Sequence, residues 1–137
     1  MRRIVVVLAL ASVVGCTQES PIAPAVRVDR VVGAYGMASV DGYALPMQVG
    51  QEGSMAIDAL SGMLELDSAA TFRNIIIYRT RGSGGIHIYA DTVQGTFLHF
   101  QDVLLLQPKD GSAPFFMDVT DDKTLTSWDY DVIVYKR

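Results

Sequence analysis

Turn-forming residues interrupt the chain from residue 31 onward, at about the 8–12-residue spacing of all-β proteins. The clearest turn signals are the runs DG at 41–42, GSGG at 82–85 and PKDG at 108–111. Short runs of β-branched and aromatic residues lie between these turns, and no long segment keeps a helical period without a breaker. The pattern therefore predicts an all-β fold.

Eleven of these runs are predicted as strands, and we expect some of them to merge or to be absent. They cover residues 33–41, 43–49, 54–59, 61–67, 71–81, 85–92, 95–101, 103–108, 114–119, 123–128 and 130–136. The run 74–78 is apolar on both faces, whereas one open sheet would show a cleaner polar face. We predict a small antiparallel up-and-down β-barrel with outer apolar contacts or a dimer interface, and a β-sandwich is the alternative.

The first residues predict a secretory signal peptide rather than part of the fold. Arg2 and Arg3 form a basic start, and the apolar run 4–14 is shorter than the roughly 20 residues that span a membrane. The following Val13-Val14-Gly15-Cys16 resembles the lipobox of bacterial lipoproteins. In that family the cysteine becomes the first mature residue, and its sulfur carries a diacylglycerol with acyl chains such as palmitate. The resemblance implies that Cys16 is lipidated.

This lipoprotein reading divides the chain into three parts. Residues 1–15 are the signal peptide, residues 16–30 are the lipidated cysteine with a flexible tether, and residues 31–137 are one β-barrel domain. Two or three acyl chains hold a domain at a membrane, since each buried CH₂ contributes about 0.8 kcal/mol. We therefore expect a lipid-anchored protein of the bacterial cell envelope, in the outer membrane and facing the periplasm.

The domain resembles the small lipocalin-like domains of bacteria. The motifs that carry the resemblance are Gly33-Ala34-Tyr35, Val40-Asp41-Gly42-Tyr43-Ala44-Leu45-Pro46, Ser61-Gly62-Met63-Leu64-Glu65-Leu66, Gly95-Thr96-Phe97 and Val134-Tyr135-Lys136-Arg137. In lipocalins the first strand carries G-x-W, and a late basic residue stacks on that Trp at the closed end of the barrel. The resemblance implies that Tyr35 takes the place of the Trp and that Arg137, or Lys136, is the late cation.

No motif in the sequence indicates catalysis. G-x-S-x-G, H-E-x-x-H and the P-loop are all missing, so we expect no enzyme activity, no catalytic residue and no cofactor. His87 and His99 are the only histidines, and two ligands make a weak site, so we expect no metal. The net charge of −4 argues against the basic face that nucleic acids require.

Methionine and aromatic side chains offer an adaptable apolar lining for a barrel interior. The candidate lining residues are Met37, Met63, Phe72, Tyr78, Phe97, Phe100 and Met117. Eight strands enclose a space that side chains can fill or that one small ligand can occupy. Two functions therefore stay open. One is non-catalytic binding of a small apolar or amphiphilic ligand. The other is a structural or protein-interaction module with a filled barrel and no small-molecule ligand, whose partner is either another protein or a second copy of the chain.

Overall fold

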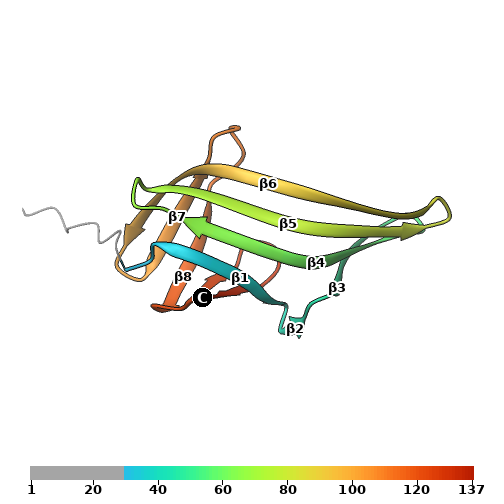
Figure 1. The fold of residues 1–137 in the computed structure, drawn as a ribbon, viewed down its shortest axis with the longest axis horizontal. Helices are drawn as coiled ribbons and strands as arrows, with labels where there is room; N and C mark the ends of the chain where they lie inside the picture. The colour runs from blue at the N-terminus through green and yellow to red at the C-terminus, as the bar shows by residue number, and fades with distance from the viewer. Residues whose placement is uncertain (1–29) are drawn as a thin grey trace, which may run out of the picture.

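The computed structural model describes residues 30–137, which fold into strands joined by turns and short loops (Figure 1). The strands are β1 (Gly33–Val40), β2 (Tyr43–Ala44), β3 (Met47–Glu52), β4 (Met55–Leu66), β5 (Thr71–Gly82), β6 (Gly85–Phe100), β7 (Val103–Pro108), β8 (Phe115–Asp121), β9 (Thr124–Ser127) and β10 (Ile133–Lys136). No helix in these residues has the length and apolar character needed to cross a membrane. The predicted signal peptide and Cys16 lie outside the described residues.

Eight of the strands close into an antiparallel β-barrel. β1 pairs with β10 on one side and with β4 on the other, so the order β1-β10-β9-β8-β7-β6-β5-β4 returns to β1. At the closure Tyr35 lies opposite Leu64, and Met37 lies opposite Tyr135. The predicted all-β, antiparallel barrel is confirmed, and the chain does not form the alternative β-sandwich.

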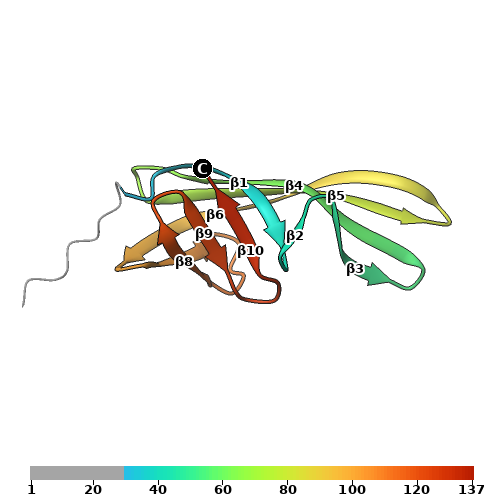
Figure 2. The same cartoon turned by 90° about the horizontal axis from the view of Figure 1, so that it is seen from below.

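Three barrel strands continue past the barrel and form a projecting sheet together with β3 (Figures 1 and 2). Only residues 63–66 of β4 pair with β1, and only residues 95–100 of β6 pair with β7. The projecting sheet, which we call the arm, consists of residues 47–52, 55–62, 76–82 and 85–91. The tip of the β5–β6 hairpin lies at the opposite end of the molecule from Arg30, where the described chain begins.

Two pairs of predicted strands are single strands in the structure. The runs 54–59 and 61–67 merge into β4, because Leu60 is accommodated as a bulge between Ala59 and Ser61. The runs 85–92 and 95–101 merge into β6, and Gly95 lies within this strand. A Cβ atom at Gly95 would overlap the backbone oxygen of Gln107. This glycine therefore marks a close approach of two strands rather than a turn.

The predicted turn at Asp41-Gly42 is confirmed. Both residues have positive φ, 50° and 81°, and they connect β1 to β2 as a two-residue turn. This is the conformation that short hairpins require and that Asp and Gly tolerate. The backbone N–H of Asp41 also donates to the oxygen of Val132, which ties the turn to the segment before β10.

The core lies inside the barrel, where inward-facing side chains from all sides meet. It contains twelve side chains that are no more than 4% exposed: Val31, Tyr35, Leu64, Leu66, Phe72, Phe97, Leu104, Leu106, Met117, Val119, Leu125 and Tyr135. Every barrel strand contributes at least one of them, so burial of this cluster and closure of the barrel depend on each other.

Candidate functional site

The barrel interior is occupied by the chain's own side chains. Phe72, Phe97 and Met117, which are three of the predicted lining residues, belong to the buried core cluster. The ring of Phe72 packs edge-on against Phe115, with the ring centroids 5.8 Å apart. These side chains fill the space that a barrel-bound ligand would need.

The other four predicted lining residues lie in two different places. Met37 and Tyr78 border a hollow at the end of the barrel where the arm begins. Met63 and Phe100 lie on the outer surface and are 40% and 51% exposed. The seven residues are thus divided among the core, the hollow and the surface, and the structure does not bring them together as one lining.

The hollow has a volume of about 220 Å³. Its walls come from β1, β3, β10, the segment before β10 and the inner face of the arm. The lining residues are Met37, Val40, Val49, Ala59, Ile76, Tyr78, Asp131 and Ile133. Small-molecule sites commonly enclose about 300–1,000 Å³. The hollow is therefore large enough only for a small group.

Two tyrosines lie at this end of the barrel. The Tyr78 ring stacks on Tyr89 with the centroids 5.5 Å apart, and the Tyr135 hydroxyl donates a hydrogen bond to Asn74 Oδ1 at 3.1 Å. Burial raises the pKa of Tyr135 to about 12. Burial, and then the charge of Asp91, raises the pKa of Tyr78. Both phenols stay protonated near neutral pH, so they pack and hydrogen-bond rather than exchange protons.

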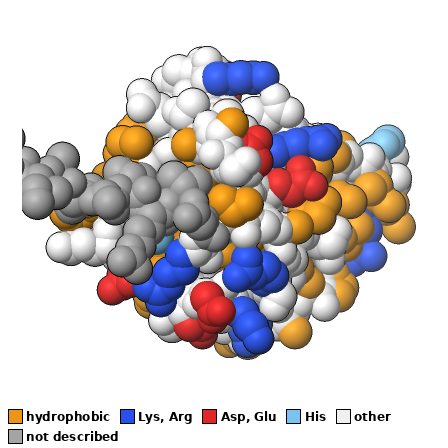
Figure 3. Space-filling model, turned by 60° about the vertical axis from the view of Figure 1, so that its left-hand side comes forward, with side chains coloured by type: hydrophobic (Ala, Val, Ile, Leu, Met, Phe, Trp, Pro, Cys, Tyr) orange, Lys and Arg blue, Asp and Glu red, His pale blue; other side chains and the backbone are white. Residues whose placement is uncertain are grey.

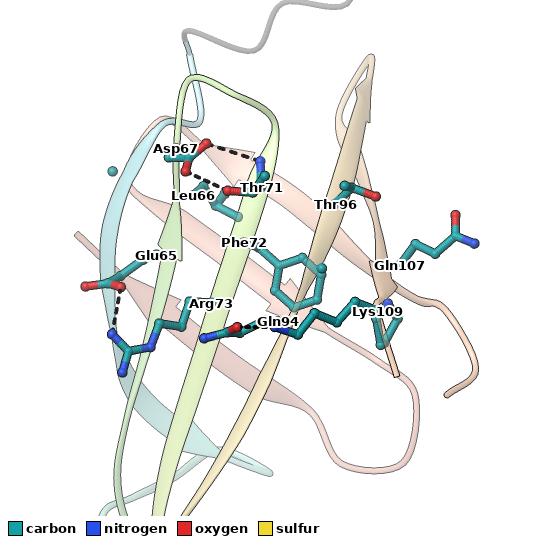
Figure 4. A pocket seen from close by; sticks show the side chains of 13 residues that line it. Glu65, Leu66, Asp67, Thr71, Phe72, Arg73, Gln94, Thr96, Gln107 and Lys109 are labelled. Atoms are coloured by element: carbon teal, nitrogen blue, oxygen red, sulfur yellow. Dashed lines mark hydrogen bonds and ion pairs between the residues drawn. The ribbon is translucent and has the colours of Figure 1, made fainter. Parts of the chain in front are cut away.

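A larger groove of about 1020 Å³ lies along β4, β5, β6 and β7, and the core side chains of Leu66 and Phe72 form part of its lining (Figure 4). Its polar side chains contact one another. Lys109 Nζ donates to Gln94 Oε1 at 2.7 Å, and an Arg73 guanidinium nitrogen lies 4.0 Å from a Glu65 carboxylate oxygen. Such exposed pairs contribute little free energy, because water screens them. The groove thus combines paired polar side chains with the apolar side chains of Leu66, Phe72 and Pro108, and it has no focused charge.

The surface charges at the end of the molecule shown in Figure 3 are mixed. On the face turned forward in Figure 3, basic side chains lie beside acidic ones, with apolar side chains between them. A phosphate-backbone interface would need a continuous field of positive sign instead. This face therefore gives no electrostatic preference for an anionic partner.

The base of the barrel, which we define by Val31, Tyr35 and Arg137, is closed by a small network. The Arg137 guanidinium carbon lies 5.3 Å from the centroid of the Tyr35 ring, and its Nη1 donates to the oxygen of Val32 at 2.7 Å. The Tyr35 hydroxyl donates to the oxygen of Val31 at 2.8 Å. A Cβ atom at Gly33 would lie 2.9 Å from Arg137 Nη1, so the glycine leaves room for the guanidinium. The structure thus brings Tyr35 and Arg137 together.

The outer face of the arm carries a carboxylate held by two arginines. Asp58 is 3% exposed, and its Oδ2 accepts hydrogen bonds from Arg79 Nε at 2.9 Å, Arg79 Nη2 at 2.7 Å and Arg81 Nε at 2.7 Å. Its Oδ1 accepts from Arg81 Nη2 at 2.8 Å. The hydrogen bonds from Arg81, and then those from Arg79, lower the pKa of Asp58 to about 2. The cluster keeps one net positive charge and fixes the two guanidinium groups across β4 and β5.

Exposed isoleucines lie beside these arginines. Ile86 is paired with Arg81, and Ile88 is paired with Arg79 on the same face. The two isoleucines are 66% and 65% exposed, and Ile77 on this face is also exposed. Contiguous apolar side chains next to fixed charges are typical of protein contact surfaces.

The two histidines do not meet. His99 is buried in the barrel, whereas His87 is exposed in the arm. Twelve positions of one strand separate them, which corresponds to roughly 40 Å. Within residues 30–137, no group of three or more His, Cys, Asp and Glu residues is placed to hold a metal ion.

The chain matches no model of a protein family and no curated protein. The candidate site therefore rests on geometry. The sequence analysis did not predict the arm's outer face as a site. The available signal was the spacing of Arg79 and Arg81, which are two residues apart, as side chains on one face of a strand must be. Asp58 gave no comparable signal, because only the register of β4 against β5 places it between them.

Proposed function

We propose that this chain is a lipid-anchored, non-catalytic interaction module of the bacterial envelope, in which a filled barrel holds the arm as a contact surface. One observation carries the proposal. The core cluster fills the barrel, while Ile86 and Ile88, both about two-thirds exposed, lie on the arm. A chain that buries apolar side chains inside and leaves such residues exposed on a projecting sheet has a surface suited to a partner.

The place where the chain enters the barrel determines the direction in which the arm of an anchored protein would point. Val31 is buried at the base, and Arg30 Nη1 lies 3.7 Å from Asp102 Oδ1 in the β6–β7 turn. The chain therefore enters the barrel at the end opposite the arm tip. With a lipid on Cys16, as the lipobox-like sequence implies, the arm would be presented away from the membrane.

The anchor is tested by the mass of the mature chain. Full-length protein from a bacterial host should carry the mass of a diacylglycerol-modified chain that begins at Cys16. The Cys16→Ser variant should lack this mass and leave the membrane fraction. An unmodified native chain in the soluble fraction would contradict the anchor.

The contact surface is tested by photo-crosslinking in intact cells. A photoreactive residue at Ile88 should give protein adducts of defined mass, and a matched probe at the exposed Thr120 on β8 should not. The Ile86→Ser substitution beside the probe should reduce the adducts, because it removes adjacent apolar area. Equal labelling from both probe positions, or none from Ile88, would contradict an arm interface.

A second candidate function is favoured by the hollow at the arm end. Its lining includes Met37 and Tyr78, which the sequence predicted as ligand contacts, so a small apolar group could bind there. Native mass spectrometry of the full-length chain distinguishes the two candidates. A small molecule that is retained, lost on denaturation and weakened by Met37→Ser would support the binding function; a mass without a small molecule supports the filled module.

A further inference from the structure

The arm has two edges, and they differ in how they are protected. β3 forms one edge, and it carries a bulge between Gln48 and Gly50, a charged Glu52 and a proline directly before the strand. Bulges, charges and prolines all hinder pairing with another strand. β6 forms the other edge, and its register against β5 runs from Gly85 to Thr96 without a shift.

The free edge of β6 covers residues 85–93. β7 joins β6 only from Gly95 onward, and among the described residues no strand pairs with this edge. The sequence of the edge, GIHIYADTV, contains no lysine and no proline. A long, regular and largely uncharged edge is a template for another β-strand.

The direction of its backbone groups follows from one hydrogen bond. The N–H of Lys109 donates to the oxygen of Gln94 at 2.9 Å, so Gln94 directs its backbone toward the side of β7 and the free edge. Alternate residues of a strand direct their backbone groups to the same side. The residues whose backbone N–H and C=O groups point toward the free edge are therefore Ile86, Ile88, Ala90 and Thr92.

We propose that two copies of the chain pair through these edges, antiparallel and centred on Tyr89, and form one continuous sheet across both arms. This inference deepens the proposed interaction function by naming the partner as a second copy. The sequence numbers of two residues that face each other across the new edge then add up to 178. Ile88 faces the partner's Ala90, and Tyr89 faces the partner's Tyr89.

Three features select this register. A two-fold axis perpendicular to the sheet keeps inner and outer faces on their own sides, so opposed residues must share a face. Sliding the second copy further toward the barrel would bring its arm tip against Lys109, which already occupies the oxygen of Gln94. Sliding it the other way loses backbone pairs. Centring on Tyr89 therefore gives the longest pairing that the structure permits.

The side chains are complementary in this register. His87 faces the partner's Asp91, and this pairing occurs twice because of the two-fold axis. The stacked Tyr78 and Tyr89 of one copy continue into the partner's pair and form a row of four rings. Tyr89 and His87 occupy non-hydrogen-bonded positions across the new edge, where opposed side chains approach most closely.

The register is tested by cysteine crosslinking of the full-length chain in membranes. Tyr89→Cys should form a reducible dimer, since Cα atoms at such positions are about 4.5 Å apart. Asp91→Cys alone should not, but it should crosslink to His87→Cys when the two variants are mixed. The native chain, with Cys16 as its only cysteine, and Thr120→Cys are the controls. Dimers from Asp91→Cys alone, or none from Tyr89→Cys, would overturn this register.

Native mass spectrometry of the full-length chain in detergent tests the edge itself. The native chain should be dimeric, and Ile88→Pro should raise the dimer dissociation constant at least about tenfold, because it removes an N–H that points outward and not toward β5. Ile88→Ala keeps this N–H and should remain dimeric; Thr92→Pro is the second variant should Ile88→Pro misfold. A monomeric native chain, or a folded dimeric proline variant, overturns self-pairing. Adducts from the Ile88 photoprobe with other proteins would still support the proposed function in that case.

Discussion

Arg137 lies over the ring of Tyr35, with its guanidinium carbon 5.3 Å from the ring centroid, and joins the end of β10 to β1. The same guanidinium donates to the backbone oxygens of Val32 and Asp122. The contact therefore holds the β8–β9 turn, β1 and β10 together at the base of the barrel. Its energy comes from a cation on an aromatic face and from two charge-assisted hydrogen bonds.

Replacing Arg137 tests this closure. We expect Arg137→Ala to lower the free energy of unfolding by about 1–3 kcal/mol, because it removes the ring contact and both hydrogen bonds. Urea denaturation followed by far-UV circular dichroism measures the change. Lys136→Ala is the matched control and should stay within about 0.5 kcal/mol, because this exposed side chain makes neither the ring contact nor the hydrogen bonds of Arg137. Equal effects of the two substitutions would contradict a specific role of Arg137.

Gly95 tests the packing where β6 crosses the barrel wall. A Cβ atom there would overlap the backbone oxygen of Gln107 and would lie 2.8 Å from the ring of Phe72. We expect Gly95→Ala to destabilise the fold by about 3 kcal/mol, at the upper end of overpacking effects. Thermal unfolding measures it. The control is Gly84→Ala in the β5–β6 turn, where a Cβ would meet no atom within 4 Å and where we expect almost no change.

Acid pH should loosen the arm before it unfolds the barrel. The pKa of Asp58 is lowered from 3.8 to about 2, so the folded arm favours the ionised carboxylate. Its contribution is complete above about pH 4 and is lost as the pH falls toward 2. At neutral pH we expect Asp58→Asn to speed amide hydrogen exchange in residues 76–82 by on the order of tenfold.

The control for the arm is Glu52→Gln, which removes an exposed carboxylate from β3 in the same sheet. It should leave exchange in residues 76–82 unchanged. Below about pH 2 the native chain and Asp58→Asn should exchange at similar rates, because Asp58 is then protonated. A constant difference between them across this pH range would show that the arginine cluster is not the cause.

Alkaline pH should lower the stability of the fold through Tyr135 in the barrel interior. Folding raises the pKa of Tyr135 from 10.0 to about 12, which favours the protonated phenol in the folded state. The resulting stability is present below pH 10 and is lost as the pH rises from 10 to about 12. Tyr135→Phe should flatten this part of the pH profile of unfolding. At neutral pH it should cost only about 0.5–1.5 kcal/mol, because it removes one hydrogen bond to Asn74.

The β-class and most turns could be predicted because they depend on local chemistry. Asp41 and Gly42 tolerate positive φ, and this property is visible in two adjacent residues. Leu60 and Gly95 misled the prediction, because a bulge and a close strand crossing look like breaks between strands. In both cases contacts with a neighbouring strand decide the outcome, and local sequence carries no record of those contacts.

The arm could not be predicted, because a strand has the same period of two inside and outside a barrel. Ile86 and Ile88 look like core residues until the pairing shows that β7 ends before reaching them. For a related reason, the sequence could not show that the candidate ligand-lining residues lie in different parts of the structure. Met63 and Leu64 are adjacent in sequence but lie on opposite faces of β4, and only the register assigns the inner face.

β5 and β6 pass from the barrel into the arm without a loop, and this continuity restricts how the length of the arm can change. One residue added to β6 beyond the barrel would turn Ile86 and Ile88 to the opposite face and separate them from Arg79 and Arg81. Only additions of two residues in each strand preserve the pattern. The distance from the barrel to the tip of the arm can therefore change only in steps of about 6–7 Å.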